Sequence, residues 1–167
     1  MDPTVKKTTL RMIPYGLYIL TAENARGEVA AATVNWVTQA SFEPPLVVVG
    51  VKADSNAHTL VQETHAFALN LLGKGQQSLA FTFFKPATKE GDRISGEPYE
   101  RGITGSPLLL HVPAAVECKV TDIVARGDHS VVVGEVVNAV LRQNPAGRPD
   151  DAILWLKELG EKVFYGG

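Results

Sequence analysis

Residues 33–60 carry polar groups where a buried strand and the turn after it would not need them. The segment begins as a polar strand, breaks at the prolines at 44 and 45, and resumes as the apolar run LVVVGV. It ends at Asp54–Asn56, a typical start of a helix. A strand end with free backbone groups, followed closely by an amide and hydroxyl anion site, suits a flat polar heterocycle that carries a phosphate.

The candidate site for the heterocycle is the strand at residues 33–41, TVNWVTQAS, which does not alternate strictly between apolar and polar residues. One interpretation is an edge strand with a polar outer face. The other is that its backbone N–H and C=O groups pair with the uracil-like edge of an isoalloxazine ring, which presents alternating acceptors and a donor. Flavin mononucleotide (FMN) joins such a ring to a phosphate. Trp36 would either stack near the ring or pack in the core.

The candidate site for the phosphate is the start of the next helix. A helix N-terminus has unpaired N–H groups and the positive end of the helix dipole, so it accepts anions. Ser55, Asn56 and His58 could donate further bonds, each worth about 1.5–3 kcal/mol when the acceptor is charged. The alternative is ordinary N-capping by one of the residues at 54–56, without a ligand.

Two motifs together resemble the flavin reductase-like family of FMN-binding split barrels. The family reads roughly T-V-S-S-x-x-S-x-x-P-P-L, then an apolar strand, then a polar S-x-x-T/H turn. The matching residues are Thr33, Val34, Asn35, Ser41, Pro44, Pro45, Leu46, Ser55 and His58. Gly127–His129 and the strand SVVVGEVV are similar to the family's G-D-H…G-x-V signature. The resemblance extends over residues 15–165.

This resemblance implies a set of site residues. The flavin would contact Thr33, Val34, Asn35, Trp36, Gln39, Ala40 and Ser41, and its phosphate would contact Ser55, Asn56, His58 and Lys85. His129 is the implied catalytic residue, near the open flavin face where nicotinamide would stack, and Tyr165 lies near the flavin. Each role has a plain alternative: a lysine on a helix C-terminal dipole, a turn at residues 127–129, and a tyrosine at the barrel rim.

The resemblance also implies an activity. In a homodimer, NAD(P)H would reduce bound FMN, which would pass electrons to free flavin or to a partner protein. Two alternatives share the same site: a tightly FMN-loaded electron carrier that does not oxidise NAD(P)H, and a non-redox flavin-binding protein. FAD in place of FMN also stays open, as does the choice between NADH and NADPH.

Composition excludes several other classes of protein. The chain has 167 residues, 45% of them apolar, which fits a single domain spanning 1–167. A net charge of −2 without a basic run argues against a nucleic-acid surface. No apolar stretch is long enough for a signal peptide or a membrane span, so we expect a cytoplasmic protein with no membrane partner.

Three further features have ordinary interpretations. The lone Cys118 excludes an intrachain disulfide, and its place in VECKV predicts a small buried residue. The loop at residues 73–78 imitates a dinucleotide-binding loop, but its third glycine is replaced by serine and no βαβ repeat surrounds it. His65 and His111 have no partners at metal-ligand spacing, so no metal site is predicted.

Short strands, few helices and hairpin signals predict a mainly β protein. The family resemblance specifies a split β-barrel of Greek-key type with short peripheral helices. The segment 85–107 is expected to be a long irregular loop. The expected strands are 17–22, 28–34, 46–51, 67–72, 115–123, 130–141 and 153–156, and the expected helices are 57–64 and 76–84.

Overall fold

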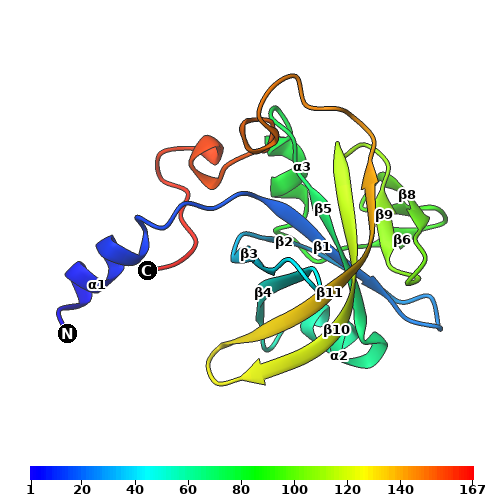
Figure 1. Ribbon diagram of the computed structural model, residues 1–167, viewed down its shortest axis with the longest axis horizontal. Helices are drawn as coiled ribbons and strands as arrows, with labels where there is room; N and C mark the ends of the chain where they lie inside the picture. Colours follow the sequence, from blue (N-terminus) through cyan, green and yellow to red (C-terminus); the bar gives the residue numbers. More distant parts are fainter.

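The computed structural model describes residues 1–167 and is mainly β (Figure 1). One antiparallel sheet has the order β2-β1-β5-β10-β11-β4-β3. Its strands are β1 (Tyr18–Glu23), β2 (Val29–Val34), β3 (Val37–Ser41), β4 (Leu46–Lys52), β5 (Ala66–Leu71), β10 (Ala114–Ala125) and β11 (His129–Leu141). The two edge strands, β2 and β3, are separated in the chain by Asn35 and Trp36 only, and the sheet curls into a split barrel. The predicted fold class is confirmed.

The smaller elements surround this barrel. Two helices pack on it, α2 (Asn56–Thr64) and α3 (Gln77–Thr82), close to their predicted ranges. A four-stranded second sheet, which we call the small sheet, lies beside it (Figure 1). Its strands are β6 (Lys89–Glu90), β7 (Arg93–Ile94), β8 (Glu97–Arg101) and β9 (Pro107–Leu109). The remaining elements are α1 (Pro3–Leu10) and the 3-10 helices η1 (Pro149–Asp151) and η2 (Leu156–Leu159).

Two expectations from the sequence are wrong. The segment 85–107 is not a wholly irregular loop, because β6, β7 and β8 of the small sheet lie within it and β9 begins at its end. Its strands are only two to five residues long, too short for a visible alternation of side chains. The predicted strand at 153–156 is reduced to isolated bridges of Ile153 with Gly73 and of Trp155 with Gly16, after which the chain turns into η2.

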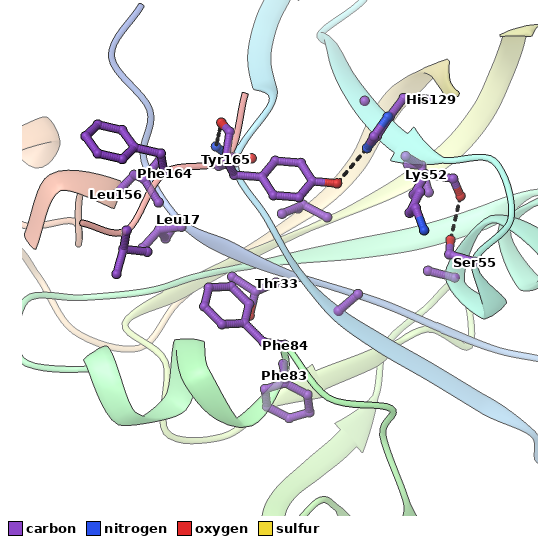
Figure 2. A pocket seen from close by; sticks show the side chains of 17 residues that line it. Leu17, Thr33, Lys52, Ser55, Phe83, Phe84, His129, Leu156, Phe164 and Tyr165 are labelled. Carbon is purple, nitrogen blue, oxygen red and sulfur yellow. Dashed lines mark hydrogen bonds between the residues drawn. The ribbon is translucent and has the colours of Figure 1, made fainter. Parts of the chain in front are cut away.

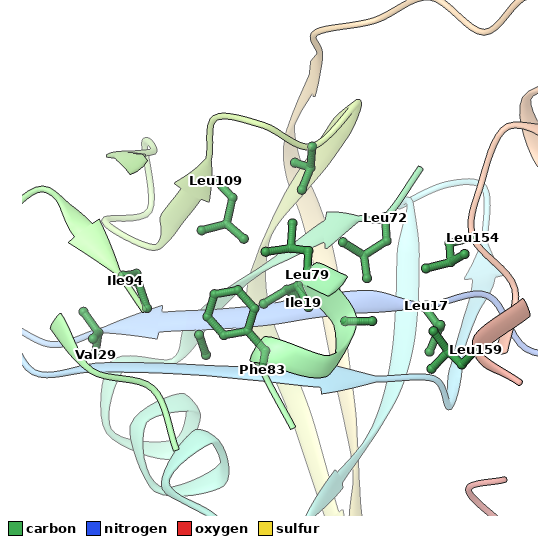
Figure 3. Close-up of a cluster of buried hydrophobic side chains, with 13 residues drawn as sticks. Leu17, Ile19, Val29, Leu72, Leu79, Phe83, Ile94, Leu109, Leu154 and Leu159 are labelled. Carbon is green, nitrogen blue, oxygen red and sulfur yellow. The ribbon is translucent and has the colours of Figure 1, made fainter. Parts of the chain in front are cut away.

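Alternation along β1 explains why the core has two parts. Leu17 and Ile19 face a cluster shared with α3 and the small sheet (Figure 3), whereas Leu20 and Ala22 face the barrel interior under α2. Cys118 belongs to the interior cluster, as expected for a small buried residue. Burial raises the pKa of its thiol to about 12, so the thiol stays protonated and unreactive.

A buried carboxylate ties the small sheet to the barrel. Glu23, at the end of β1, has a side chain that is 1% exposed and pairs with Lys89 at 2.6 Å and with Arg101. Its Oε2 also accepts a bond from the Tyr99 hydroxyl at 3.3 Å. Burial alone would raise the pKa of Glu23, but the hydrogen bonds from Arg101 and Lys89 lower it on balance. The carboxylate therefore stays charged.

A second buried carboxylate fixes the loop between β8 and β9. Glu117 on β10 accepts bonds from the backbone N–H groups of Ile103 at 3.2 Å and Thr104 at 2.9 Å. The side chains of Thr104 and Asn138 donate to it as well, at 2.8 and 2.7 Å. Burial acts to raise the pKa of Glu117, and these four donors lower it on balance. The loop is thus held to β10 without any cation.

The two chain termini lie together, away from the small sheet (Figure 1). Helix α1 has no buried residue and projects from the barrel. Beside it runs the segment from Gly160 to Gly167, which we call the tail. Arg11 joins the two: its Nε donates to the carbonyl of Gly166 at 3.1 Å, and its guanidinium lies 4.4 Å from the ring centre of Phe164. None of the helices has the length and apolar character that crossing a membrane requires.

Candidate functional site

A cavity of about 410 Å³ opens at the end of the barrel near the tail (Figure 2). Its volume falls within the range of about 300–1,000 Å³ that is typical of small-molecule sites. Most of its lining is apolar. The polar side chains on it are those of Thr33, Asn35, Lys52, Ser55, His129 and Tyr165. We refer to it below as the first cavity.

One side of the first cavity is the chain between β2 and β3. Both donors of Thr33 are used within the protein. Its N–H donates to the carbonyl of Phe83 at 3.1 Å, and its hydroxyl donates to the carbonyl of Ala80 at 2.7 Å. The backbone N–H groups of Asn35 and Trp36, by contrast, have no acceptor within the protein. Unpaired backbone N–H groups are rare in folded proteins, so two adjacent ones suggest that a ligand pairs with them. A ligand edge rich in acceptors would suit this pair.

Trp36 packs inside the protein at the boundary between the cavity and the tail. Its ring centre lies 4.6 Å from that of His129 and 5.3 Å from that of Tyr165. Gly50 leaves room for it, because a Cβ there would lie 3.0 Å from the Trp36 ring. The buried indole Nε1 has no hydrogen-bond partner. The indole therefore supports the cavity wall and holds one unused donor.

A corner that combines the start of α2 with the ammonium group of Lys52 forms where β4 meets α2. The Ser55 hydroxyl donates to the carbonyl of Lys52 at 2.7 Å and accepts from the N–H of His58 at 3.1 Å, which caps the helix. The next N–H groups, of Asn56 and Ala57, have no acceptor within the protein. Lys52 adds its charge, and the Asp54 carboxylate 3.0 Å away raises the pKa of this lysine. The corner can thus hold an anion.

A chain of three side chains runs beside this corner, because His129 on β11 is paired in register with Lys52 on β4 (Figure 2). His129 Nδ1 lies 2.9 Å from a carboxylate oxygen of Asp128, and its Nε2 lies 2.7 Å from the hydroxyl of Tyr165. The bond to His129 lowers the pKa of Asp128, and burial raises the pKa of Tyr165. Asn35 also donates its side-chain amide to the carbonyl of Tyr165 at 3.3 Å. The tail is thereby fixed across the cavity.

The structure brings together part of the predicted set and leaves part elsewhere. Residues on the first cavity are Thr33, Val34, Asn35, Ser55, His129 and Tyr165. His58 points away from it and is buried, with Nε2 2.8 Å from the hydroxyl of Ser130. The amide of Asn56 donates to the carbonyl of Val29 at 3.4 Å. Outside the lining are also Gln39, Ala40 and Ser41 on β3, and Lys85 beyond α3. Their roles stay predictions.

Several lining residues were not predicted. These are Leu17, Ala32, Gly50, Val51, Lys52, Ala57, Phe83, Phe84, Leu156, Val163 and Phe164. Lys52 had a usable signal, since it stands two residues before the helix-start motif at 54–56. Phe164 stands in the aromatic-glycine ending that resembles the family's, next to the predicted Tyr165. Val163 had no signal, because the tail lacks any periodicity that would indicate which way its side chains point.

Comparison with known proteins gives one consistent family. Residues 10–158 match the family model described as flavin reductase like domain. An NADH:riboflavin 5'-phosphate oxidoreductase of Streptomyces pristinaespiralis is 31% identical over 83% of this chain and 76% of its own length. Diflavin flavoprotein A 1 of Synechocystis sp. is 37% identical over 83% of this chain, but over only 24% of its own length.

The solved structures agree with this family. A Streptomyces globisporus NADH:FAD oxidoreductase, in complex with NAD and FAD fragments, aligns with a TM-score of 0.68 and 28% identity. The alignment covers 77% of this chain and 76% of that protein. The chain spans less than two thirds of the length of several curated relatives that it matches.

Proposed function

This chain belongs to the flavin reductase-like domain family, and we propose that it is an NAD(P)H-dependent flavin reductase that holds FMN in the first cavity. Relatives that act on NADH with riboflavin 5'-phosphate or with FAD support the reaction class. FMN is preferred here over FAD because the anion-binding corner is formed by a single helix start and a single lysine.

The observation that carries this proposal is the position of the unpaired donors. Asn35 and Ala57 line the apolar cavity, and each has a free N–H group beside that of a chain neighbour, Trp36 and Asn56 respectively. A ring with acceptors on its edge would use the first pair, and a phosphate would use the second pair together with Lys52. The donor set thus fits an FMN molecule.

Each part of the cavity has a role in the proposed reaction. FMN held in this cavity would supply the redox chemistry, which is electron transfer from a nicotinamide nucleotide to free flavin or a partner protein. The N–H groups of Asn35 and Trp36 orient the ring, and the apolar wall that includes Phe84 and Val163 excludes water. His129, hydrogen-bonded to both Asp128 and Tyr165, would help to orient the nucleotide on the open side.

Titration with FMN tests this proposal directly. Binding should quench flavin fluorescence and give a yellow protein, and no binding up to about millimolar FMN, where ΔG is about −4 kcal/mol, would contradict it. Anaerobic stopped-flow mixing of the loaded protein with NADH and with NADPH then measures reduction. A Kd near micromolar, about −8 kcal/mol, fits a flavin that leaves as product. Much tighter binding without reduction by either nucleotide would favour the electron carrier.

Substitution of His129 separates turnover from flavin retention. His129→Ala should slow reduction by about tenfold at most, which is the loss of one hydrogen bond of about 1–1.5 kcal/mol. FMN affinity should stay within a factor of a few. Loss of flavin with a normal rate of reduction in the fraction that remains loaded would move His129 to the flavin site instead.

The homodimer is part of the same proposal. Large apolar side chains stay exposed on the barrel, among them Phe42, which is 88% exposed, and Val124 and Val131 on the β10–β11 hairpin. A two-fold interface over such a surface would cover them. Sedimentation should show a dimer, and a flavin-loaded monomer would contradict this part of the proposal.

A further inference from the structure

When the His129 ring is neutral, its hydrogen bonds to Asp128 and Tyr165 can run in one direction only. A carboxylate only accepts, so His129 Nδ1, 2.9 Å from Asp128, carries the proton of the neutral ring. Its Nε2 is then an acceptor, and the Tyr165 hydroxyl at 2.7 Å is the donor. Both ring nitrogens of His129 are therefore used before any ligand arrives.

Tyr165 is held in place by contacts that come from three parts of the chain. Asn35 binds its carbonyl at 3.3 Å, and the Trp36 ring packs against its ring at 5.3 Å. The next residue, Gly166, is fixed by Arg11 and has a φ of 123°, which only glycine adopts readily. A Cβ at this position would lie 3.4 Å from the indole of Trp36, at ordinary van der Waals contact. The tail is thus specifically seated.

We propose that Tyr165 is the positioning residue of His129, donating to Nε2 so that the imidazole keeps one tautomer and one orientation at the first cavity. As a consequence, His129 offers no N–H of its own to a ligand. The Tyr165 oxygen, which lines the cavity, is the acceptor that this pair presents to a nucleotide carboxamide. The part of this inference that concerns turnover rests on the proposed flavin reductase function.

Nitrogen NMR of the flavin-free protein tests the hydrogen-bond direction without any reaction. In the wild type, His129 should show a protonated Nδ1 and an unprotonated Nε2 whose signal is shifted by an accepted bond. Tyr165→Phe keeps the ring and should move the Nε2 signal to the position of a free acceptor. Tyr15→Phe is a matched control at a tyrosine outside the lining of the first cavity, and it should leave the signal unchanged.

Kinetics of the loaded protein test the consequence for turnover. Tyr165→Phe should reduce the rate of flavin reduction up to about tenfold, as expected for one lost hydrogen bond. The same variant should leave FMN affinity within a factor of a few, and Tyr15→Phe should leave the rate unchanged. Circular dichroism and thermal unfolding would verify that each variant folds.

Several outcomes would overturn the proposal. A wild-type His129 with Nε2 protonated, or an Nε2 signal that ignores Tyr165→Phe, removes the donated bond. A faster reduction in Tyr165→Phe would mean that the tyrosine competes with the nucleotide for His129. If neither nucleotide reduces the wild-type protein while the NMR result holds, the proposed function fails and the positioning of His129 by Tyr165 stands.

Discussion

Two peripheral segments are attached to the same barrel in different ways. The small sheet buries Ile94, Leu108 and Leu109 in the core and is joined to β1 through the ion pairs of Glu23. The tail has no buried residue after Leu159 and is attached by a few hydrogen bonds and ring contacts. One segment is part of the core, and the other lies on its surface.

This difference indicates how a ligand reaches the first cavity. Segments with few buried apolar contacts open locally at a lower free energy than core segments. Each polar contact of the tail contributes about 0.5–1.5 kcal/mol, so the tail should open far more often than the small sheet. We therefore expect the rate of ligand exchange to depend on local opening of the tail. The small sheet should instead contribute to the free energy of unfolding.

The largest effect should come from breaking the attachment of the small sheet. Glu23→Gln removes the charge that pairs with Lys89 and Arg101. Breaking a buried ion pair costs about 3–5 kcal/mol. We expect about 3 kcal/mol here, because Arg101 is 60% exposed and keeps access to water. Chemical denaturation measures the free energy of unfolding.

A matched substitution sharpens this result. Glu28→Gln removes a carboxylate from an ion pair with Arg26 in which both side chains are more than half exposed, and it should hardly change stability. Equal destabilisation by both variants would show that burial of the Glu23 pair has no special importance.

The contribution of these buried carboxylates should also make the stability of the protein depend on pH. Glu23 and Glu117 both have pKa values that are lowered in the folded protein. Their contribution to stability is therefore complete above the unfolded glutamate pKa of about 4.3, and is lost as pH falls through the folded values. Glu23→Gln should flatten this acid loss in pH-dependent unfolding curves. An unchanged acid slope would contradict it.

The next effect concerns a part of the first cavity that belongs to the barrel. Lys52→Met should weaken FMN binding by roughly 1–3 kcal/mol while hardly changing riboflavin affinity, because only FMN carries the phosphate. Lys85→Met is the comparison variant. Lys85 was predicted from the family resemblance to bind the phosphate, but it does not line the cavity. Fluorescence titration with both ligands measures the difference. A larger effect at Lys85 would relocate the phosphate.

The smallest effect should come from the tail itself. Arg11→Met removes the bond to Gly166 and the contact with Phe164, which together are worth about 1 kcal/mol at an exposed site. FMN should then associate and dissociate severalfold faster, with little change in Kd. Hydrogen exchange of the tail amides should accelerate as well. Lys6→Met, on the same helix but away from the tail contacts, is the control, and identical exchange in both variants would contradict the comparison.

The sequence predicted well where local patterns decide the structure, and poorly where a side-chain direction depends on distant parts of the chain. A hairpin signal at residues 24–27 indicated β1 and β2, and Gly27 has the positive φ, 77°, that this turn requires; the apolar run at 67–72 indicated β5. The split-barrel order required the family resemblance, because strand periodicity does not specify neighbours. The tail contacts of Arg11 join residues 155 positions apart.

The two histidines of the motifs illustrate this limit. From their place in a motif, His58 was assigned to the flavin phosphate and His129 to the open flavin face as the catalytic residue. In the structure His58 turns inward to Ser130, whereas His129 faces the first cavity. Motif position alone does not distinguish these orientations, because a ring on the first turn of a helix can point to the ligand or to the core.

Phe164 and Tyr165 have a further property: they line a second cavity of about 390 Å³ as well as the first. Arg11, Tyr15 and Trp155 form part of its other walls. The two spaces thus share one partition. If a molecule in either space shifts this partition, thermodynamic linkage requires that each occupant change the affinity of the other by the same factor. The tail would then be a coupling element as well as a cover.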